Sequence, residues 1–158
     1  MSQKGNKWND AIGFDFTENV SKENFTLGIK ICVDGNGKLV WSYDLGGSIR
    51  SRPAVGDLTG DGSPEIVVST SEGRIVALST ENGPKEIWSY EMAGRLDVFR
   101  WPTIVDLDQD GEQEILVTDD MGWIVCLSSS GKRRWRFTID KYRASAPGVG
   151  DLDGDSLP

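Results

Sequence analysis

The feature that most constrains this fold is a unit that returns every 45 to 49 residues along the chain. The string "GDLTGDG", which starts at Gly56, comes back as "VDLDQDG" and as "GDLDGDS". The prolines that open the three copies are Pro53, Pro102 and Pro147, and the tryptophans that keep a spacing of 47 are Trp41, Trp88 and Trp135. A fixed period of this length is typical of propellers and other repeat folds, in which one supersecondary unit is used several times.

Each full unit divides into four short segments that are typical of β-strands. The first segment, as in "PAVGDL", is brief, and the second and third, as in "EIVVST" and "GRIVALS", are rich in β-branched residues. The fourth, "KEIWSYE" or "RRWRFTI", alternates polar with apolar residues. No window shows a sustained helical period. Four strands in a unit of this length predict an all-β chain of antiparallel β-propeller blades, with the fourth strand outermost.

The repeat also predicts how the chain is divided. A divergent segment at 1–27 precedes a half blade with the third and fourth strands at 28–47, full blades at 48–95 and 96–141, and a half blade with the first strand and its acidic loop at 142–158. This amounts to about three blades, and a closed propeller needs at least about four. Three alternatives stay open: a piece of a longer chain, a homo-oligomer of two copies whose half blades complete six blades, or an open row with exposed edges. For a stable purified protein we favour the homo-oligomer.

Composition excludes several classes of function. The chain has 25 acidic and 17 basic residues, a net charge of −8, which argues against nucleic acid as a partner. It has no histidine, and this excludes histidine zinc sites and Ser-His-Asp triads. No apolar run is long enough to cross a membrane, and the first residues, "MSQKGNKWND", show no signal peptide. The two cysteines, Cys32 and Cys126, align at one small position of the third strand, so we expect buried free thiols.

The acidic loops are the candidate metal sites. Numbered from the first Asp, oxygen-bearing residues stand at positions 1, 3, 5, 7 and 9 of each loop. They are Asp57, Thr59, Asp61, Ser63 and Glu65 in the first loop, Asp106, Asp108, Asp110, Glu112 and Glu114 in the second, and Asp151, Asp153 and Asp155 in the third. Alternate oxygens on a tight glycine-bearing loop suit Ca²⁺, which takes six to eight oxygen ligands, better than Mg²⁺.

The acid-rich loops have two other interpretations. An EF-hand needs a Glu at position 12, where these loops have Val68 or Val117 inside a strand, so that interpretation fails. A solvated turn would also be rich in Asp and Gly. Against it stands the mutual repulsion of several carboxylates that lack a counter-ion. The third loop lacks a ninth position.

The loops resemble a known family of repeats. The segments "PAVGDLTGDGSPEIVV", "PTIVDLDQDGEQEILV" and "PGVGDLDGDS" resemble the FG-GAP/VCBS propeller repeats of integrin α-subunit heads and bacterial surface proteins. The outer segments "GRIVALSTENGPKEIWSY" and "GKLVWSYDL" resemble PQQ-type propeller repeats, whose outer strand ends in a tryptophan. The resemblance covers roughly residues 28–158 and departs at Thr59 and in the first 27 residues. It implies calcium on the loop positions named above and an extracellular or cell-surface location, with the periplasm also compatible.

The predicted function is a calcium-binding, non-catalytic β-propeller module that binds protein or glycan ligands, as in cell adhesion. Candidate recognition residues are aromatic or basic residues in the connections between blades, and ordinary packing is the alternative for them. They are Arg50, Arg52, Phe99, Arg100, Trp101 and Arg143. Two other functions stay open: a fragment of a propeller enzyme, either a polysaccharide lyase or a quinone-dependent dehydrogenase, and a self-assembling propeller fragment. The enzyme alternative rests on fold analogy alone.

Overall fold

The computed structural model describes residues 29–33, 35–46, 49, 51–92, 101–139 and 147–154, which hold ten strands and no helix. The strands form three antiparallel sheets, each a simple meander. The first sheet is β1 (Ile29–Val33) and β2 (Leu39–Asp44); the second is β3 (Ala54–Gly56), β4 (Glu65–Ser69), β5 (Arg74–Ser79) and β6 (Lys85–Glu91); the third is β7 (Thr103–Val105), β8 (Glu114–Thr118), β9 (Trp123–Leu127) and β10 (Arg133–Thr138). The prediction of an all-β chain with four antiparallel strands per full unit is confirmed.

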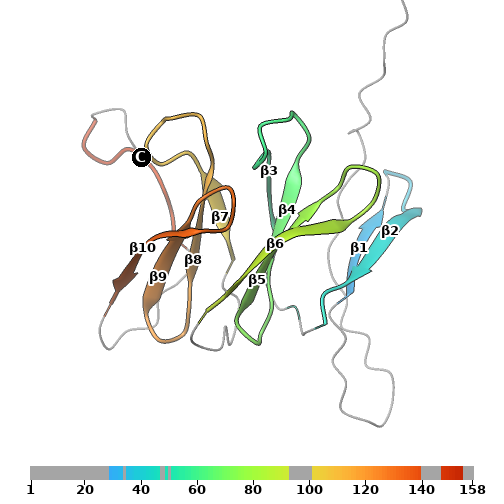
Figure 1. Ribbon diagram of the computed structural model, residues 1–158, viewed down its shortest axis with the longest axis horizontal. Helices are drawn as coiled ribbons and strands as arrows, with labels where there is room; N and C mark the ends of the chain where they lie inside the picture. The colour runs from blue at the N-terminus through green and yellow to red at the C-terminus, as the bar shows by residue number, and fades with distance from the viewer. Residues whose placement is uncertain are drawn as a thin grey trace, which may run out of the picture.

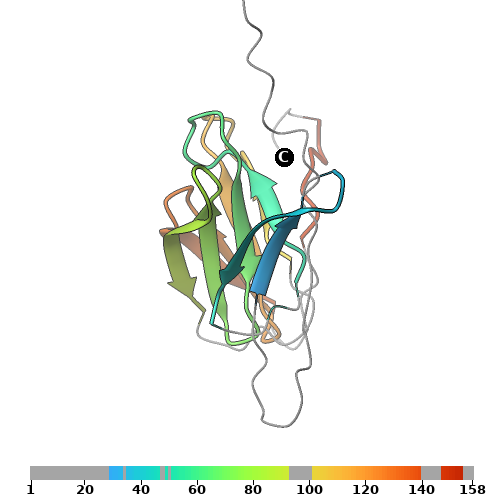
Figure 2. The ribbon, with the colours of Figure 1, turned by 90° about the vertical axis from the view of Figure 1, so that its right-hand side faces the viewer.

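The sheets stand side by side in chain order, as propeller blades do (Figure 1). Figure 2 looks along this row, with β1 and β2 nearest the viewer. The four-stranded sheets lie within the ranges predicted for the full blades, and β1 and β2 lie within the predicted half blade. The predicted divergent segment at 1–27 lies outside the described residues.

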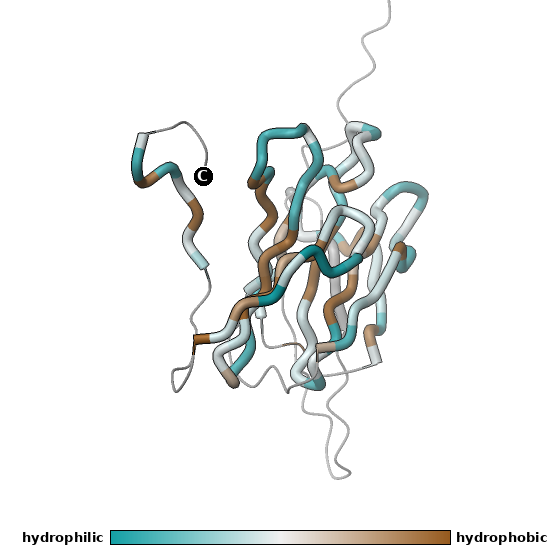
Figure 3. The backbone as a smooth tube through the Cα atoms, turned by 60° about the vertical axis from the view of Figure 1, so that its left-hand side comes forward, coloured by the Kyte–Doolittle hydropathy of each residue, from teal (hydrophilic) through white to brown (hydrophobic). Residues whose placement is uncertain are grey.

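The middle strands are buried on both faces because each four-stranded sheet packs between neighbours. Every residue of β4 is buried, and successive residues alternate between two apolar clusters. Val67 belongs to the cluster between the two four-stranded sheets, whereas Ile66 and Val68 belong to the cluster beside β1 and β2. The predicted strands with two apolar faces are therefore confirmed, and Figure 3 shows these apolar strands below hydrophilic loops.

The outer strands seal the spaces between the sheets with aromatic side chains. Trp41 and Tyr43 of β2 pack against the second sheet, and Trp88 and Tyr90 of β6 pack against the third. The Trp88 indole also donates a hydrogen bond from Nε1 to the Ser129 carbonyl oxygen, at 2.8 Å. This bond satisfies the polar edge of a partly buried indole, so apolar packing and a hydrogen bond both hold the ring in place.

A glycine makes the approach of Trp88 possible. Gly131 lies in the β9–β10 turn with φ +78°, and a Cβ built on it would meet the Trp88 ring at 2.5 Å. That distance is far below van der Waals contact, so only glycine lets the ring lie flat on the turn. We refer to this contact between the outer-strand tryptophan and the next hairpin as the Trp–Gly contact.

A β-bulge precedes the tryptophan in every outer strand. The register skips one residue of the outer strand in each sheet, so that Val40, Ile87 and Arg134 have no partner across the ladder. A bulge turns its extra side chain away from the regular alternation. Each unit therefore has one bulge residue whose side chain departs from the regular alternation, and the type of this residue differs between units.

The thiol of Cys126 has a packing role. Cys126 is a buried free cysteine on β9, as expected, whereas the side chain of Cys32 lies outside the described ones. Burial, and secondarily the nearby charge of Glu114, raises the pKa of the Cys126 thiol to about 11, so it stays protonated at neutral pH. No helix among the described residues is long and apolar enough to cross a membrane.

Gly131→Ala should destabilise the protein by about 2–4 kcal/mol, because the left-handed backbone conformation disfavours alanine and the new methyl group clashes with Trp88. Gly46→Ala is the matched control, since Gly46 has φ +69° and open space around its Cβ position. Its cost should be the backbone cost alone, about 1–2 kcal/mol. Urea unfolding of both variants measures the difference, and equal losses would contradict the Trp–Gly contact.

Candidate metal site in the acidic loops

The acidic loops follow the inner strands and lie at the same end of their sheets (Figure 1). The first loop joins β3 to β4 and the second joins β7 to β8, and Figure 1 shows both at the same end of their sheets. The third loop follows Pro147 and is described through Gly154, so Asp155 lies outside the described residues. The ninth position of the first two loops, Glu65 or Glu114, is the first residue of β4 or β8, as predicted.

The two ninth-position glutamates are buried and hold the loops to the sheets. Glu65 is 2% exposed, and its Oε2 accepts hydrogen bonds from the backbone N–H of Leu58 at 2.8 Å and of Thr59 at 3.2 Å. Glu114 is also buried, and its Oε2 accepts from the N–H of Leu107 at 2.9 Å. Each glutamate thus fixes the start of its loop from the far side of the turn.

Burial raises the pKa of Glu65 because desolvation disfavours the charged carboxylate. The hydrogen bonds from Leu58 and Thr59 act in the opposite direction, and the charges of Asp61 and Asp57 add to the rise. Together these effects leave the pKa of Glu65 above its ordinary value. The loop therefore holds a carboxylate that is costly to ionise when no cation is nearby.

The first Asp of each loop caps backbone amides of its own turn. Asp57 accepts hydrogen bonds from Gly60 N through Oδ1 at 2.7 Å and from Gly62 N through Oδ2 at 2.8 Å. Asp151 accepts from Gly154 N in the same way, at 2.6 Å. These contacts are Asx-turn chemistry, so the acids of the first and third loops have a structural role without any metal.

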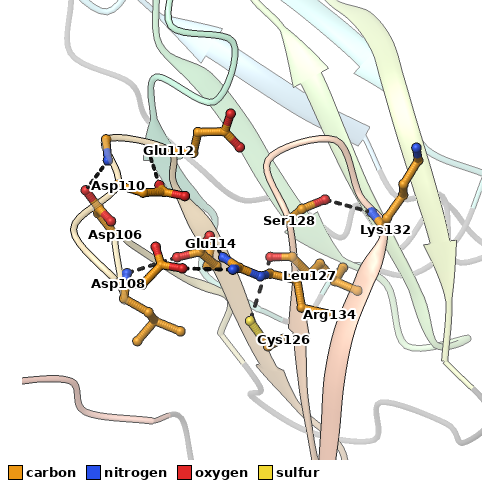
Figure 4. A network of polar contacts seen from close by, with 12 residues as sticks. Asp106, Asp108, Asp110, Glu112, Glu114, Cys126, Leu127, Ser128, Lys132 and Arg134 are labelled. Carbon is orange, nitrogen blue, oxygen red and sulfur yellow. Dashed lines mark hydrogen bonds and ion pairs between the residues drawn. The ribbon is translucent and has the colours of Figure 1, made fainter.

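The fifth position behaves alike in both complete loops. Asp61 Oδ1 accepts from Ser63 N at 2.7 Å, and Asp110 Oδ1 accepts from Glu112 N at 2.8 Å. In Figure 4 the side chain of Glu112 points away from the other acids of the second loop. The structure therefore does not gather all five predicted ligands of a loop around one point.

The second loop does bring three carboxylates together. Asp106, Asp108 and Glu114 each offer an oxygen within 4.8 Å of the others, and they form the one such group among the described residues. Asp106 Oδ2 accepts from Gly111 N at 3.0 Å, but Oδ1 is buried and has no hydrogen-bond partner. A buried oxygen without a donor is costly, and a hard cation would satisfy it. The residues of this loop thus fit part of a calcium site.

The counter-ion of this cluster was not predicted from the sequence. Arg134, the bulge residue of β10, contacts Asp108 Oδ2 through its guanidinium at 2.8 Å and pairs with Glu114 Oε1 (Figure 4). The hydrogen bond with Arg134 lowers the pKa of Asp108, and the two carboxylates raise the pKa of Arg134. The available signal was the position before the tryptophan, where the other units have Val40 and Ile87.

The recognition candidates lie at the opposite end of the inner strands. The guanidinium of Arg52, just before β3, lies 4.6 Å from the ring centroid of Trp101, just before β7. This cation–π contact joins the connections of two neighbouring blades. The other four candidates, Arg50, Phe99, Arg100 and Arg143, lie outside the described residues.

Residues 30–155 match the protein family described as outer membrane protein assembly factor BamB. The chain belongs to this family. The match confirms the PQQ-type resemblance of the outer strands, whereas the FG-GAP/VCBS resemblance of the acidic loops stays a prediction.

A similar solved structure is the crystal structure of BamB from Moraxella catarrhalis, with a TM-score of 0.55 and 22% identity. The alignment covers 72% of this BamB-family chain and 30% of that one, so the likeness shows the propeller fold, and the chain spans less than a third of that structure. No curated protein gives a match.

Glu65→Gln should remove a pH dependence from the metal-free protein. Because the folded-state pKa of Glu65 is raised, its contribution to stability is present below the unfolded pKa near 4.5 and is lost as the pH rises through the folded value. In chelator, the wild type should therefore lose stability relative to Glu65→Gln as the pH rises above 4.5. Urea unfolding of both proteins over this pH range measures the difference. If the difference in unfolding free energy between the two proteins stayed constant with pH, the raised pKa of the buried Glu65 carboxylate would be contradicted.

Proposed function

We propose that this chain is a calcium-stabilised, non-catalytic propeller scaffold that holds protein partners during assembly. The observation that carries the proposal is the row of sheets sealed by the Trp–Gly contact, with acidic loops at one end and aromatic and basic connections at the other. Such a row presents two chemically different rims, one at each end of its strands. Membership of the BamB family supports an assembly role.

Calcium would act in the second loop, through Asp106, Asp108 and Glu114. The support is the orphaned oxygen of Asp106, the convergence of the three carboxylates and the resemblance of the loops to FG-GAP/VCBS repeats. A bound ion would neutralise the repulsion among these groups and tie the loop to β8. Arg134 already supplies one positive charge there, so calcium and Arg134 compete for Asp108 and Glu114.

The partner-binding rim would be the end that carries Arg52 and Trp101. An aromatic ring paired with a guanidinium offers both a flat apolar surface and hydrogen-bond donors, and these are the residue types that dominate protein interfaces. The description of the family as an outer membrane protein assembly factor supports a protein partner of that class. It also supports a location in the cell envelope, at the cell surface or in the periplasm.

A non-catalytic role agrees with how the buried acids are used. Glu65 and Glu114 are occupied by backbone amides and, for Glu114, by Arg134, so they hold loops in place and are poorly placed to transfer protons. The alternative of a propeller enzyme, whether a polysaccharide lyase or a quinone-dependent dehydrogenase, rests on fold analogy alone. We therefore propose binding as the function.

Calcium should raise the melting temperature of the wild type, because an ion that binds only the folded state stabilises it by mass action. Asp106→Asn should lose most of this shift, since it removes the charge of the central ligand. Glu81→Gln, an exposed acid in the β5–β6 turn, is the control and should keep the shift. Thermal melts in millimolar calcium and in excess chelator measure the effect.

Arg134→Gln gives a second readout for the same site. The variant should melt at a lower temperature than the wild type in chelator, because the buried carboxylate of Glu114 loses its charged partner. Its calcium shift should be larger than that of the wild type, because calcium no longer displaces the guanidinium. An absent calcium shift in both the wild type and Arg134→Gln would contradict the metal assignment.

Trp101→Ala should weaken binding of an unfolded outer membrane protein, because it removes the aromatic surface beside Arg52. The matched control is Trp123→Ala, which removes a second cation–π pair, in which the guanidinium of Arg136 on the outer strand β10 lies 4.0 Å from the ring centroid of Trp123 on β9. Fluorescence anisotropy of a labelled outer membrane protein diluted from urea measures the affinity. No binding by the wild type, or equal binding by both variants, would contradict the proposed rim.

A further inference from the structure

The outer strand of the third sheet is basic in a chain that is acidic overall. Within β10, Arg133, Arg134 and Arg136 carry positive charge and no acid is present, whereas the chain has a net charge of −8. The outer strand β2 has one acid and no base, and β6 has two acids and one base. Arg134 is already paired with Asp108 and Glu114, so Arg133 and Arg136 are the two cations without an assigned role.

The β-bulge of β10 places these two arginines on one face of the strand. Residues three apart in a regular strand point to opposite faces. Here the register passes over the bulge residue, so that Arg133 lies opposite Leu127 and Arg136 lies opposite Val125. Both partners belong to the cluster between the second and third sheets, and side chains opposite each other share a face. The arginines therefore lie on the face of β10 that is turned toward the second sheet.

The second sheet neutralises its own charge at the same positions. By register, Trp123, Arg133, Arg136 and Thr138 of the third sheet correspond to Arg74, Glu86, Ser89 and Glu91 of the second. The Arg74 guanidinium donates to both carboxylate oxygens of Glu86 at 2.8 Å and to Ser89 Oγ at 3.3 Å. It also lies 3.8 Å from Glu91 Oε1. Each charge of this set thus has a partner within its own sheet.

The third sheet has two cations and no acid at these positions. Arg136 stacks on Trp123, and a cation–π contact leaves the N–H groups at the edge of the guanidinium able to donate. The Arg133 side chain makes no ion pair with the described residues. Trp88 and Tyr90, which pack toward the third sheet from β6, are uncharged. Both arginines are exposed, so the described part of the chain presents an unneutralised cationic pair.

We propose that Arg133 and Arg136 bind an extended acidic segment of a protein partner, with one carboxylate to each guanidinium. The residues opposite them on β9 are two positions apart, which is about 7 Å along a strand. Side chains on one face of an extended peptide repeat at the same interval. Acids at alternate positions of the segment therefore match the arginines, and a guanidinium binds a carboxylate through two parallel hydrogen bonds.

An extended segment fits the arginine pair better than a compact anion does. Arg136 stacks on Trp123, which lies two positions beyond Val125 on β9, on the side away from Arg133. The two guanidiniums are therefore separate anchors, and the ligand must present two separate acidic groups. The description of the family as an outer membrane protein assembly factor supports a protein as the source of these groups.

This inference goes beyond the proposed function, because it adds a second contact surface that needs no calcium. The strands β8 and β9 separate β10 from the inner strand β7, and Trp101 of the partner-binding rim lies just before β7. Trp123→Ala leaves both arginines in place. Variants at the rim and variants on β10 therefore test different surfaces.

Nuclear magnetic resonance titration of the isotope-labelled chain in chelator tests the proposal. The probe is a short threonine-based peptide that carries two glutamates two positions apart. We expect this peptide to shift the backbone amide signals of β10 and the indole N–H signal of Trp123. The net charge of −8 repels an acidic peptide from the rest of the surface, which localises the binding. Unchanged signals at millimolar peptide concentrations would overturn the proposal.

Substitutions at the pair give the matched comparison. Arg133→Gln and Arg136→Gln should each weaken binding of the glutamate peptide by about three- to tenfold. Lys85→Gln removes one positive charge from an exposed position of the outer strand β6 and should leave the affinity unchanged. Circular dichroism should show the wild-type β spectrum for each variant, because all three side chains are exposed. An equal loss of affinity in Lys85→Gln would assign the effect to overall charge and overturn the proposal.

A charge exchange gives a readout that a structural role would not produce. The double variant Arg133→Glu and Arg136→Glu should lose the glutamate peptide and bind the same peptide with lysines in place of its glutamates. A double variant that binds neither peptide would contradict direct pairing between the side chains and the ligand.

Three further ligands test the chemistry and the spacing. A peptide with glutamines in place of the glutamates should not bind. A peptide with adjacent glutamates should bind more weakly, because neighbouring side chains of an extended chain point to opposite sides. Inorganic phosphate should also bind more weakly, because it offers one anionic group. Equal affinity for the glutamine peptide would overturn the acidic contact, and equal affinity for either of the other two ligands would overturn the extended segment as the occupant.

Discussion

The packing of sheet face on sheet face is the interaction on which the rest of this structure depends. No single sheet can bury two apolar faces by itself, so β4 acquires its core on one side from β1 and β2 and on the other from the third sheet. Trp88 closes that core at the outer edge, and Gly131 lets it do so.

The acidic loops are built on this framework. Their first Asp residues order the turns through backbone amides, and the buried Glu65 and Glu114 tie the turns to the middle strands. The second loop then has an unsatisfied oxygen and an internal cation, Arg134, at the same place. A loop that is already folded by its own hydrogen bonds can bind an ion with little reorganisation, and this supports the proposed role of calcium as a stabiliser of the loops.

Much of this could be predicted from the sequence, because the period fixes which residues share a position. It predicted the strands, the buried middle positions and the glutamates at the start of β4 and β8. It did not predict which carboxylates converge, because Asx-turn bonds and ligand geometry favour the same residues. The period also did not predict the role of Arg134. The side chain of Arg134 extends toward the second loop because of a β-bulge, and a bulge leaves no pattern in the composition.

Because the second and third sheets share one core, we expect them to fold as one unit. Native-state hydrogen exchange tests it most directly, because it gives a free energy of opening for each amide. We expect the amides of β4 and β8 to be the most protected and to exchange with the same free energy, in a single cooperative unfolding. Exchange of the third sheet while β4 stays protected would show that the sheets are independent units and would contradict a shared core.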